Sequence, residues 1–168
     1  MNILITTGIY PPDVGGPAKF VPLISLSLSK FHNLKIITLS DKKDNEHNNN
    51  LEVLRIIRKQ NKFLRVLKTI ASIIKNGKNV DVIFVNGLWL ETYIANLILR
   101  KRIVRKIVGD PIWEKYYSNY EIDDGFDEFQ VKTYGLKIQF LKFIRNISIK
   151  SADTIIVPSN HLLDYIKN

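Results

Sequence analysis

Eight residues suited to binding a polar ligand follow three apolar segments of this 168-residue chain. They are Gly15, Gly16, Pro17, Asn86, Trp89, Asp110, Trp113 and Glu114. A glycine pair before a helix lets the backbone approach a ligand closely and points free N–H groups at an anion. Carboxylates accept hydrogen bonds from sugar hydroxyls, and tryptophan offers a flat face for stacking. Asp110, Trp113 and Glu114 together are therefore typical of carbohydrate recognition.

Each of these positions also has a structural interpretation. The glycine pair suits a tight turn, and Asp110 suits a capped turn beside a buried tryptophan. Asn86 suits contact with ligand hydroxyls and capping of the next helix equally well. Glu91, in the first turn of that helix, is expected to be structural because the helix dipole favours a carboxylate there. For Asp110 we favour the binding role, because ligands gather at the carboxyl ends of parallel strands.

Strands alternating with helices are predicted to position these residues. Apolar and β-branched runs predict strands at residues 2–7, 34–39, 51–57, 80–85, 103–108 and 154–157. Helical spacing predicts helices at 18–31, 62–75, from after Gly87 to about Arg100, 126–150 and after Ser159. The alternation indicates an α/β fold, a Rossmann-like three-layer sandwich with a mainly parallel sheet. The loops 8–16, 86–89 and 109–114 would then open at one edge of that sheet.

Four segments carry more specific expectations. Pro17 suits the first position of a helix, but Pro22 predicts that the helix starts late or is bent. Residues 40–50 have the composition of an exposed loop, and residues 109–125 that of a long functional loop. The helix at 126–150 carries an apolar stripe, formed by Leu136, Phe140, Phe143, Ile144 and Ile147.

The composition indicates one globular domain. Hydrophobic residues make up 45% and charged residues 24%, as in ordinary folded proteins. The apolar runs are much shorter than a spanning helix, and the N-terminus passes directly into a strand without a signal sequence, so a cytoplasmic location is expected. The chain has no cysteine, which excludes disulfides and thiolate chemistry. Its three histidines, His32, His47 and His161, are too scattered to predict a metal site.

The formal net charge of +9 suggests an anionic partner. The helix at 62–75 has an apolar face and a basic face, and with the residues before it the basic face is a candidate for contact with anionic lipid headgroups. The candidate membrane-surface residues are Arg58, Lys62, Arg65 and Lys68. The alternative is a solvated helix face, because the chain is rich in Lys, Asn and Ile, all encoded by A/T-rich codons.

Two segments together resemble a known family. The strand ending in Thr6-Thr7 is followed by Tyr10-Pro11-Pro12-Asp13-Val14-Gly15-Gly16-Pro17-Ala18, and near the other end lies Ala152-Asp153-Thr154-Ile155-Ile156-Val157-Pro158-Ser159. In order and spacing these segments resemble the N-terminal domain of the group 1 glycosyltransferases, the retaining family 4 enzymes of GT-B fold. The resemblance covers essentially the whole chain.

The resemblance implies two Rossmann-like domains that face each other across a cleft, with residues 1–168 forming the acceptor-side domain. The donor-binding C-terminal domain, with its pair of glutamates, would lie outside this sequence and act in cis or in trans. By position, Gly15 and Gly16 would lie near the donor phosphates and the acceptor. Many members place a histidine after the fifth strand, where this chain has the segment 109–114, so Asp110 is the catalytic candidate.

The implied reaction moves a sugar from a nucleotide-sugar, held mainly by the other domain, to a glycan or lipid-linked acceptor at the inner face of the membrane. No cofactor and no essential metal are implied, and this chain alone is not expected to catalyse the transfer. The alternative is a non-catalytic subunit that anchors and docks a separate catalytic chain. No nucleic-acid partner is expected, because the aromatic residues are not interleaved with the basic runs.

Overall fold

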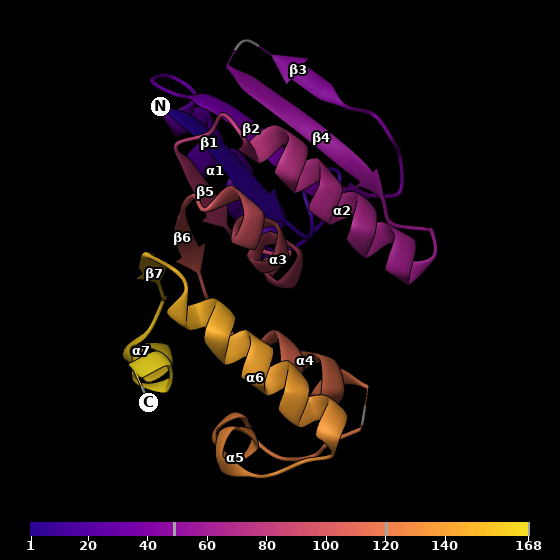
Figure 1. The fold of residues 1–168 in the computed structure, drawn as a ribbon, viewed down its shortest axis with the longest axis vertical. Helices are drawn as coiled ribbons and strands as arrows, with labels where there is room; N and C mark the ends of the chain where they lie inside the picture. Colours follow the sequence, from indigo (N-terminus) through magenta and orange to yellow (C-terminus); the bar gives the residue numbers. More distant parts are fainter. Residues whose placement is uncertain (49, 120, 168) are drawn as a thin grey trace.

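The computed structural model describes residues 1–48, 50–119 and 121–167. Its centre is a seven-stranded sheet in the order β3-β4-β2-β1-β5-β6-β7 (Figure 1). The strands are β1 (Asn2–Thr7), β2 (Asn33–Ser40), β3 (Glu46–Asn48), β4 (Leu51–Ile57), β5 (Val82–Val85), β6 (Arg102–Lys106) and β7 (Thr154–Ile156). All neighbours pair in parallel except β3, which runs antiparallel to β4 at the edge. The predicted Rossmann-like α/β fold is confirmed.

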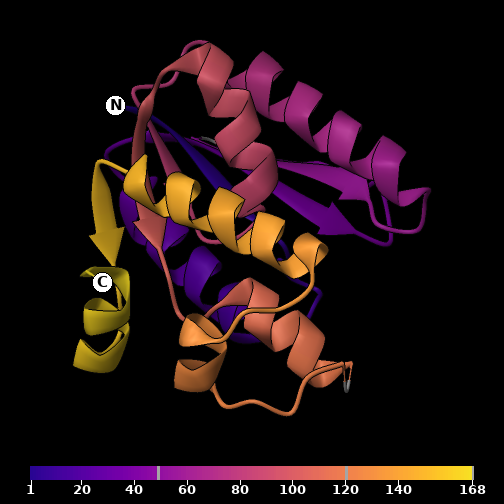
Figure 2. The same cartoon turned by 60° about the horizontal axis from the view of Figure 1, so that its bottom comes forward.

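Helices cover both faces of this sheet. They are α1 (Gly16–Leu28), α2 (Lys62–Gly77), α3 (Trp89–Leu99), α4 (Pro111–Ser118), α5 (Phe126–Val131), α6 (Leu136–Lys150) and α7 (Asn160–Lys167). Helices α2, α3 and α6 lie on one face of the sheet, and α1 lies on the other (Figure 1). Helices α4, α5 and α7 group at one end of the molecule, as the turned view shows (Figure 2). Within the described residues, no helix is both long enough and apolar enough to cross a membrane.

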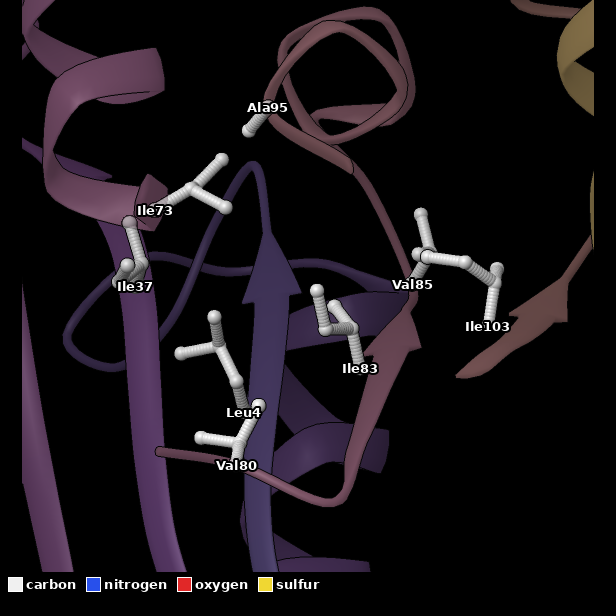
Figure 3. Packing of buried hydrophobic residues seen from close by; sticks show 8 residues of the cluster. All are labelled: Leu4, Ile37, Ile73, Val80, Ile83, Val85, Ala95 and Ile103. Carbon is white, nitrogen blue, oxygen red and sulfur yellow. The ribbon is translucent and has the colours of Figure 1, made fainter. Parts of the chain in front are cut away.

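The core consists of two apolar clusters, one on each face of the sheet. Successive side chains of β1 point to opposite faces, so Leu4 joins the first cluster and Ile5 the second, and both are fully buried. The first cluster packs the strands against Ile73 of α2 and Ala95 of α3 (Figure 3). The second packs them against Val21 of α1. The sheet is therefore rigid where its strands reach the candidate site.

In the first half of the chain, one of the two alternatives for the first helix and one predicted loop are wrong. Helix α1 begins at Gly16 and contains Pro22, so the late start is not observed. The predicted loop at 40–50 contains β3, because a hairpin turns the chain back onto β4. Arg55 of β4 holds the segment before β3 in place by donating to the Asp44 carbonyl at 2.8 Å and pairing with Glu46. Asn49 lies outside the described residues.

The predicted loop at 109–125 and the predicted helix at 126–150 also differ from the structure. The first contains α4, although Tyr120 lies outside the described residues. The second is two helices, α5 and α6, separated at residues 132–135, and the ammonium group of Lys142 binds the carbonyls of Phe129, Gln130 and Lys132 at the end of α5. A cation at these free carbonyls stabilises a helix C-terminus, and the chain turns before α6 begins.

Helix α6 is orientated with its apolar stripe away from the sheet. Leu136 is 91% exposed, Phe140 62% and Phe143 61%, whereas Lys142 and Arg145 are buried. Apolar helix stripes normally face the core. Here the polar face is buried because it pairs with buried polar groups. Lys142 binds the α5 carbonyls, Arg145 binds Asp110, and Ser148 binds Arg105. An apolar face in the same place would leave these groups unpaired. The predicted apolar stripe is present, but most of it is exposed at the surface of the described structure.

Candidate functional site

The three predicted site loops follow β1, β5 and β6, which are adjacent in the sheet. The loops after β1 and β5 are in direct contact, since the Thr6 hydroxyl donates to the Gly87 carbonyl at 3.1 Å and the Asn86 N–H donates to the Thr6 carbonyl at 2.9 Å. The loop after β6 begins one strand further along and ends at Asp110. The topology therefore brings the loops to one edge of the sheet, as predicted.

Gly87 is required by the close approach of two backbones. A Cβ atom on Gly87 would lie 2.6 Å from the nitrogen of Gly8, whereas a Cβ on Gly8 would meet no atom within 4 Å. We therefore expect Gly87→Ala to lower the free energy of unfolding by about 1–3 kcal/mol through overpacking. The matched change Gly8→Ala should have an effect of less than about 0.5 kcal/mol. Urea denaturation measures both, and equal effects would contradict the predicted crowding.

The glycine pair Gly15 and Gly16 opens α1. Gly15 has a φ of +152°, which L side chains rarely adopt, and a Cβ there would lie 2.7 Å from the Ile9 side chain. A Cβ on Gly16 would meet nothing within 4 Å, so this position opens outward. No side chain of the described residues caps the helix start, and Pro17 follows in the first turn. The free N–H groups of Gly16 and Ala18 are thus available to an anion.

Arg58 fixes the loop that precedes α1. Its guanidinium pairs with Asp13, donates to the Leu39 carbonyl at 3.2 Å and lies 3.6 Å from Asp41. Arg65 also turns inward, donating to the Arg58 carbonyl at 3.3 Å. The structure therefore uses these two predicted membrane-surface residues to hold the loop. The other two, Lys62 and Lys68, are exposed on α2.

Asn86 and Trp89 lie at the carboxyl end of β5. Asn86 does not cap α3, because Leu88 occupies the cap position with a φ of 53°. The Asn86 side-chain nitrogen is buried and has no partner among the described residues. Trp89 lies over the guanidinium of Arg105, with 5.5 Å between the guanidinium carbon and the ring centroid. Burial raises the pKa of Glu91 in the first turn of α3.

Asp110 is fully buried and caps α4. Its Oδ1 accepts from the N–H groups of Ile112 at 2.8 Å and Trp113 at 3.4 Å. Its Oδ2 accepts from the Gln130 amide at 3.1 Å and pairs with Arg145, whose side chain is only 3% exposed. Both oxygens are thus held by the protein. Asp110 can therefore influence a ligand only indirectly, by fixing the position of the Arg145 side chain.

Trp113 and Glu114 follow on α4. The Trp113 indole donates to the Asp124 carbonyl at 3.0 Å, and its ring stacks on Tyr117 with 5.0 Å between centroids. Glu114 is an exposed residue whose carboxyl group lies against the backbone of Gly109. Partial burial raises the pKa of the Glu114 carboxyl, and the nearby charge of Asp110 raises it further. Both residues lie beyond the end of β6, and Trp113 packs against a small separate core formed by Ile112, Tyr116, Ile122 and Phe129.

A cavity of about 470 Å³ lies between α5, α6 and α7. Its polar wall carries two carboxylates, two amides and two cations, from Asp127, Asp164, Gln130, Asn146, Arg145 and Lys150. Its apolar wall comes from Val131, Ile149, Tyr165 and Ile166. At the rim His161 lies 2.9 Å from Asp127. Arg145 therefore joins the buried carboxylate of Asp110 to an open, polar cavity.

A much smaller cavity, of about 60 Å³, lies between α3 and α6. Arg105 lines it and donates to the Ser148 hydroxyl at 2.6 Å. Burial lowers the pKa of Arg105 to about 10. The space holds little more than water. Among the described residues, no group of three or more His, Asp or Glu side chains is arranged to hold a metal ion.

No protein-family model matches the sequence, and no curated protein is similar to it. Solved structures do share its fold. A protein described as a UDP-N-acetylglucosamine 2-epimerase from Listeria monocytogenes is similar over 99% of this chain, with a TM-score of 0.59 and 13% identity. This chain spans 41% of that structure, which is less than half its length. The likeness shows a Rossmann-like domain of the GT-B type and nothing of its chemistry.

Two further structures are more distant. A DNA/pantothenate metabolism flavoprotein from Streptococcus pneumoniae has a TM-score of 0.49 and 12% identity, and the match covers 94% of this chain and 81% of that one. A structure of trehalose-6-phosphate from E. coli bound with UDP-2-fluoro glucose has a TM-score of 0.41 and 12% identity, covering 70% of this chain and 35% of that one. Neither likeness is close enough to carry an argument.

Proposed function

We propose that this chain is the acceptor-binding half of a retaining glycosyltransferase, which transfers a sugar from a nucleotide-sugar to a glycan or lipid-linked acceptor. The observation that carries the proposal is the cavity between α5, α6 and α7. Its volume falls in the range of small-molecule sites, and it combines one apolar wall with convergent polar groups. The fold is shared with a protein described as a UDP-N-acetylglucosamine 2-epimerase, and the proposal extends the UDP-sugar class of substrate to this chain.

The cavity suits a sugar better than a purely apolar or purely ionic ligand. The carboxylates of Asp127 and Asp164 accept hydrogen bonds from hydroxyls, and the amides of Gln130 and Asn146 both donate and accept. A sugar also has apolar C–H faces, which the ring of Tyr165 can cover. The positive and negative groups that line the cavity balance, so a neutral acceptor sugar is the expected occupant.

The glycine pair supplies the proposed anion-binding part of the function at the start of α1. The uncapped start of α1 is suited to an anionic group, and the phosphates of the donor are the anion that a nucleotide-sugar supplies. A second, donor-binding domain would hold the nucleotide in cis or in trans. Asp110 acts in this scheme as a positioning residue, because it fixes the guanidinium of Arg145 at the wall of the cavity.

The proposal is tested by titrating the ¹⁵N-labelled protein with glucose, galactose and N-acetylglucosamine separately. Amide shifts of residues in α5–α7 are expected for at least one sugar, and Asn146→Ala should abolish them. The matched control is Asn79→Ala, an exposed asparagine at the opposite edge of the sheet, which should leave the shifts unchanged. Shifts with none of the sugars, or shifts that survive Asn146→Ala, would count against an acceptor site here.

The second candidate function is a non-catalytic subunit that anchors a separate catalytic chain at the inner face of a membrane. The observation that favours it is the uncovered apolar face of α6. An anchoring subunit would bind vesicles without binding any of the three sugars. The two functions are therefore separated by combining the sugar titration with a vesicle-binding measurement.

A further inference from the structure

The outer face of α6 is a narrow apolar stripe with no cover. Its members are Leu136, Phe140, Phe143 and Ile147, which are 91%, 62%, 61% and 37% exposed. At 100° per residue, these four positions fall within an arc of about 60° of the helix. The stripe is therefore a continuous ridge along the whole length of α6.

The orientation of this ridge is fixed by the polar side of the helix. Lys142 is bound to three carbonyls of the α5 end, Arg145 to Asp110, and Ser148 to Arg105. Rotating α6 to bury the phenylalanines would leave Asp110 and the α5 carbonyls buried without partners, which is costly. The fold thus holds the apolar ridge at the surface.

The charges on α6 and α2 themselves are of one sign. Helix α6 contains no Asp or Glu in its 15 residues, and its exposed cations are Lys137 and Lys150, which border the ridge on either side. Helix α2 lies on the same side of the sheet and has no acidic residue in its 16 residues either (Figure 1). It exposes Lys62 and Lys68. An apolar ridge flanked by lysines complements an anionic lipid surface.

Helices α3 and α2, on the same side of the sheet as α6, also expose apolar residues. Leu97 of α3 is 59% exposed and borders the same small cavity as Ser148 of α6. On α2, Phe63 is 70% and Leu64 51% exposed, next to Lys62. Side chains that can enter the headgroup region and lysines that can reach phosphates are thus presented by three helices on one side of the sheet.

We infer that the outer face of α6, together with the exposed Leu97 of α3 beside it, docks this domain on an anionic lipid bilayer in the plane of the membrane. In this docking mode α6 lies at the membrane interface. Arg58 and Arg65 are not needed for it, because they bind groups within the protein. This inference does not depend on the sugar chemistry proposed above. A membrane-bound position would suit a lipid-linked acceptor.

The test is co-sedimentation of the full chain with vesicles of phosphatidylcholine alone and of phosphatidylcholine mixed with phosphatidylglycerol. Wild type is expected to bind the mixed vesicles and to bind the neutral ones weakly. The double change Phe140→Ser with Phe143→Ser should weaken binding by more than about tenfold. Lys137→Gln should weaken it about fivefold, the equivalent of one lysine near an anionic surface.

The matched control is Leu23→Ser with Leu26→Ser on α1, where the two leucines are 66% and 62% exposed on the other face of the sheet. This pair should bind vesicles like wild type. Circular dichroism and the sugar titration should be unchanged in both double variants, which separates a failure of docking from a failure of the proposed acceptor site. Equal binding by wild type and the Phe140/Phe143 variant would overturn the inference. So would a wild-type dimer in sedimentation that binds no vesicles, because the ridge would then be a protein interface.

Discussion

Asp110→Ala is expected to be the most destabilising single change in this protein. It removes the only carboxylate that pairs with Arg145 among the described residues, and it leaves a guanidinium whose side chain is 3% exposed. Removing one partner of a buried ion pair typically costs about 3–5 kcal/mol. The α4 cap is lost as well, which adds about 1 kcal/mol. Urea denaturation followed by far-UV circular dichroism measures the loss.

A loss of this size approaches the whole stability of many domains, so a second variant keeps the prediction measurable. Asp110→Asn retains an oxygen for the cap and should cost less than Asp110→Ala. The double variant Asp110→Ala with Arg145→Met should cost less than the sum of the single changes, because it removes both charges together. Asp127→Ala is the control, since its pair with His161 is exposed and should contribute less than about 1 kcal/mol. A change of less than about 1 kcal/mol for Asp110→Ala would show that the ion pair does not hold α4 to α6.

The sheet could be predicted from the sequence because most of its strands are short, mainly apolar and β-branched runs. The runs around Leu4, Ile36 and Ile83 are buried on both faces, and such runs leave little ambiguity about element type. Parallel pairing then followed from the helices between them. The edge strand β3 was missed because Glu46, His47 and Asn48 are polar and exposed, so their pairing with β4 leaves no apolar pattern.

The second half of the chain was harder to predict because its polar residues are buried and its apolar residues are exposed. Periodicity alone marked Phe140 and Phe143 as one stripe, but it carries no information on which way a stripe faces. The signal that was available is the pair Lys142 and Arg145, two cations on the side of the helix opposite the apolar stripe. Their partners are the α5 carbonyls and Asp110, which lie 10 or more positions away in the chain, so the contacts depend on tertiary structure.

Only part of the candidate site could be predicted from the sequence. Strand ends can be located from the sequence, and the loops carrying Gly15, Asn86 and Asp110 do follow three adjacent parallel strands, so they start at one edge of the sheet. The cavity was missed because Gln130 and Arg145 were assigned to one continuous helix. On one helix, 15 positions apart, they could not meet, whereas in the structure the Arg145 guanidinium donates to the Gln130 side-chain oxygen at 3.1 Å. The break between α5 and α6, which depends on Lys142, is what creates the site.

Lys142→Met is therefore expected to loosen the cavity as well as the fold. The change preserves the volume of the side chain but removes the ammonium group that binds the carbonyls of Phe129, Gln130 and Lys132. Hydrogen bonds to a charged group contribute about 1.5–3 kcal/mol, and carbonyls left buried without partners add to the loss. We expect a loss of about 2–4 kcal/mol in the free energy of unfolding.

Hydrogen exchange distinguishes this mechanism from a general loss of packing. In Lys142→Met, the amides of α5 and of the turn before α6 should exchange faster than those of β1 and β5, because the end of α5 loses its cation. Lys137→Met, on the exposed side of the same helix, is the matched control and should leave exchange and stability near wild type. Uniformly faster exchange across the sheet and α5 alike would mean that Lys142 supports the whole domain, and the break between the helices would then need another cause.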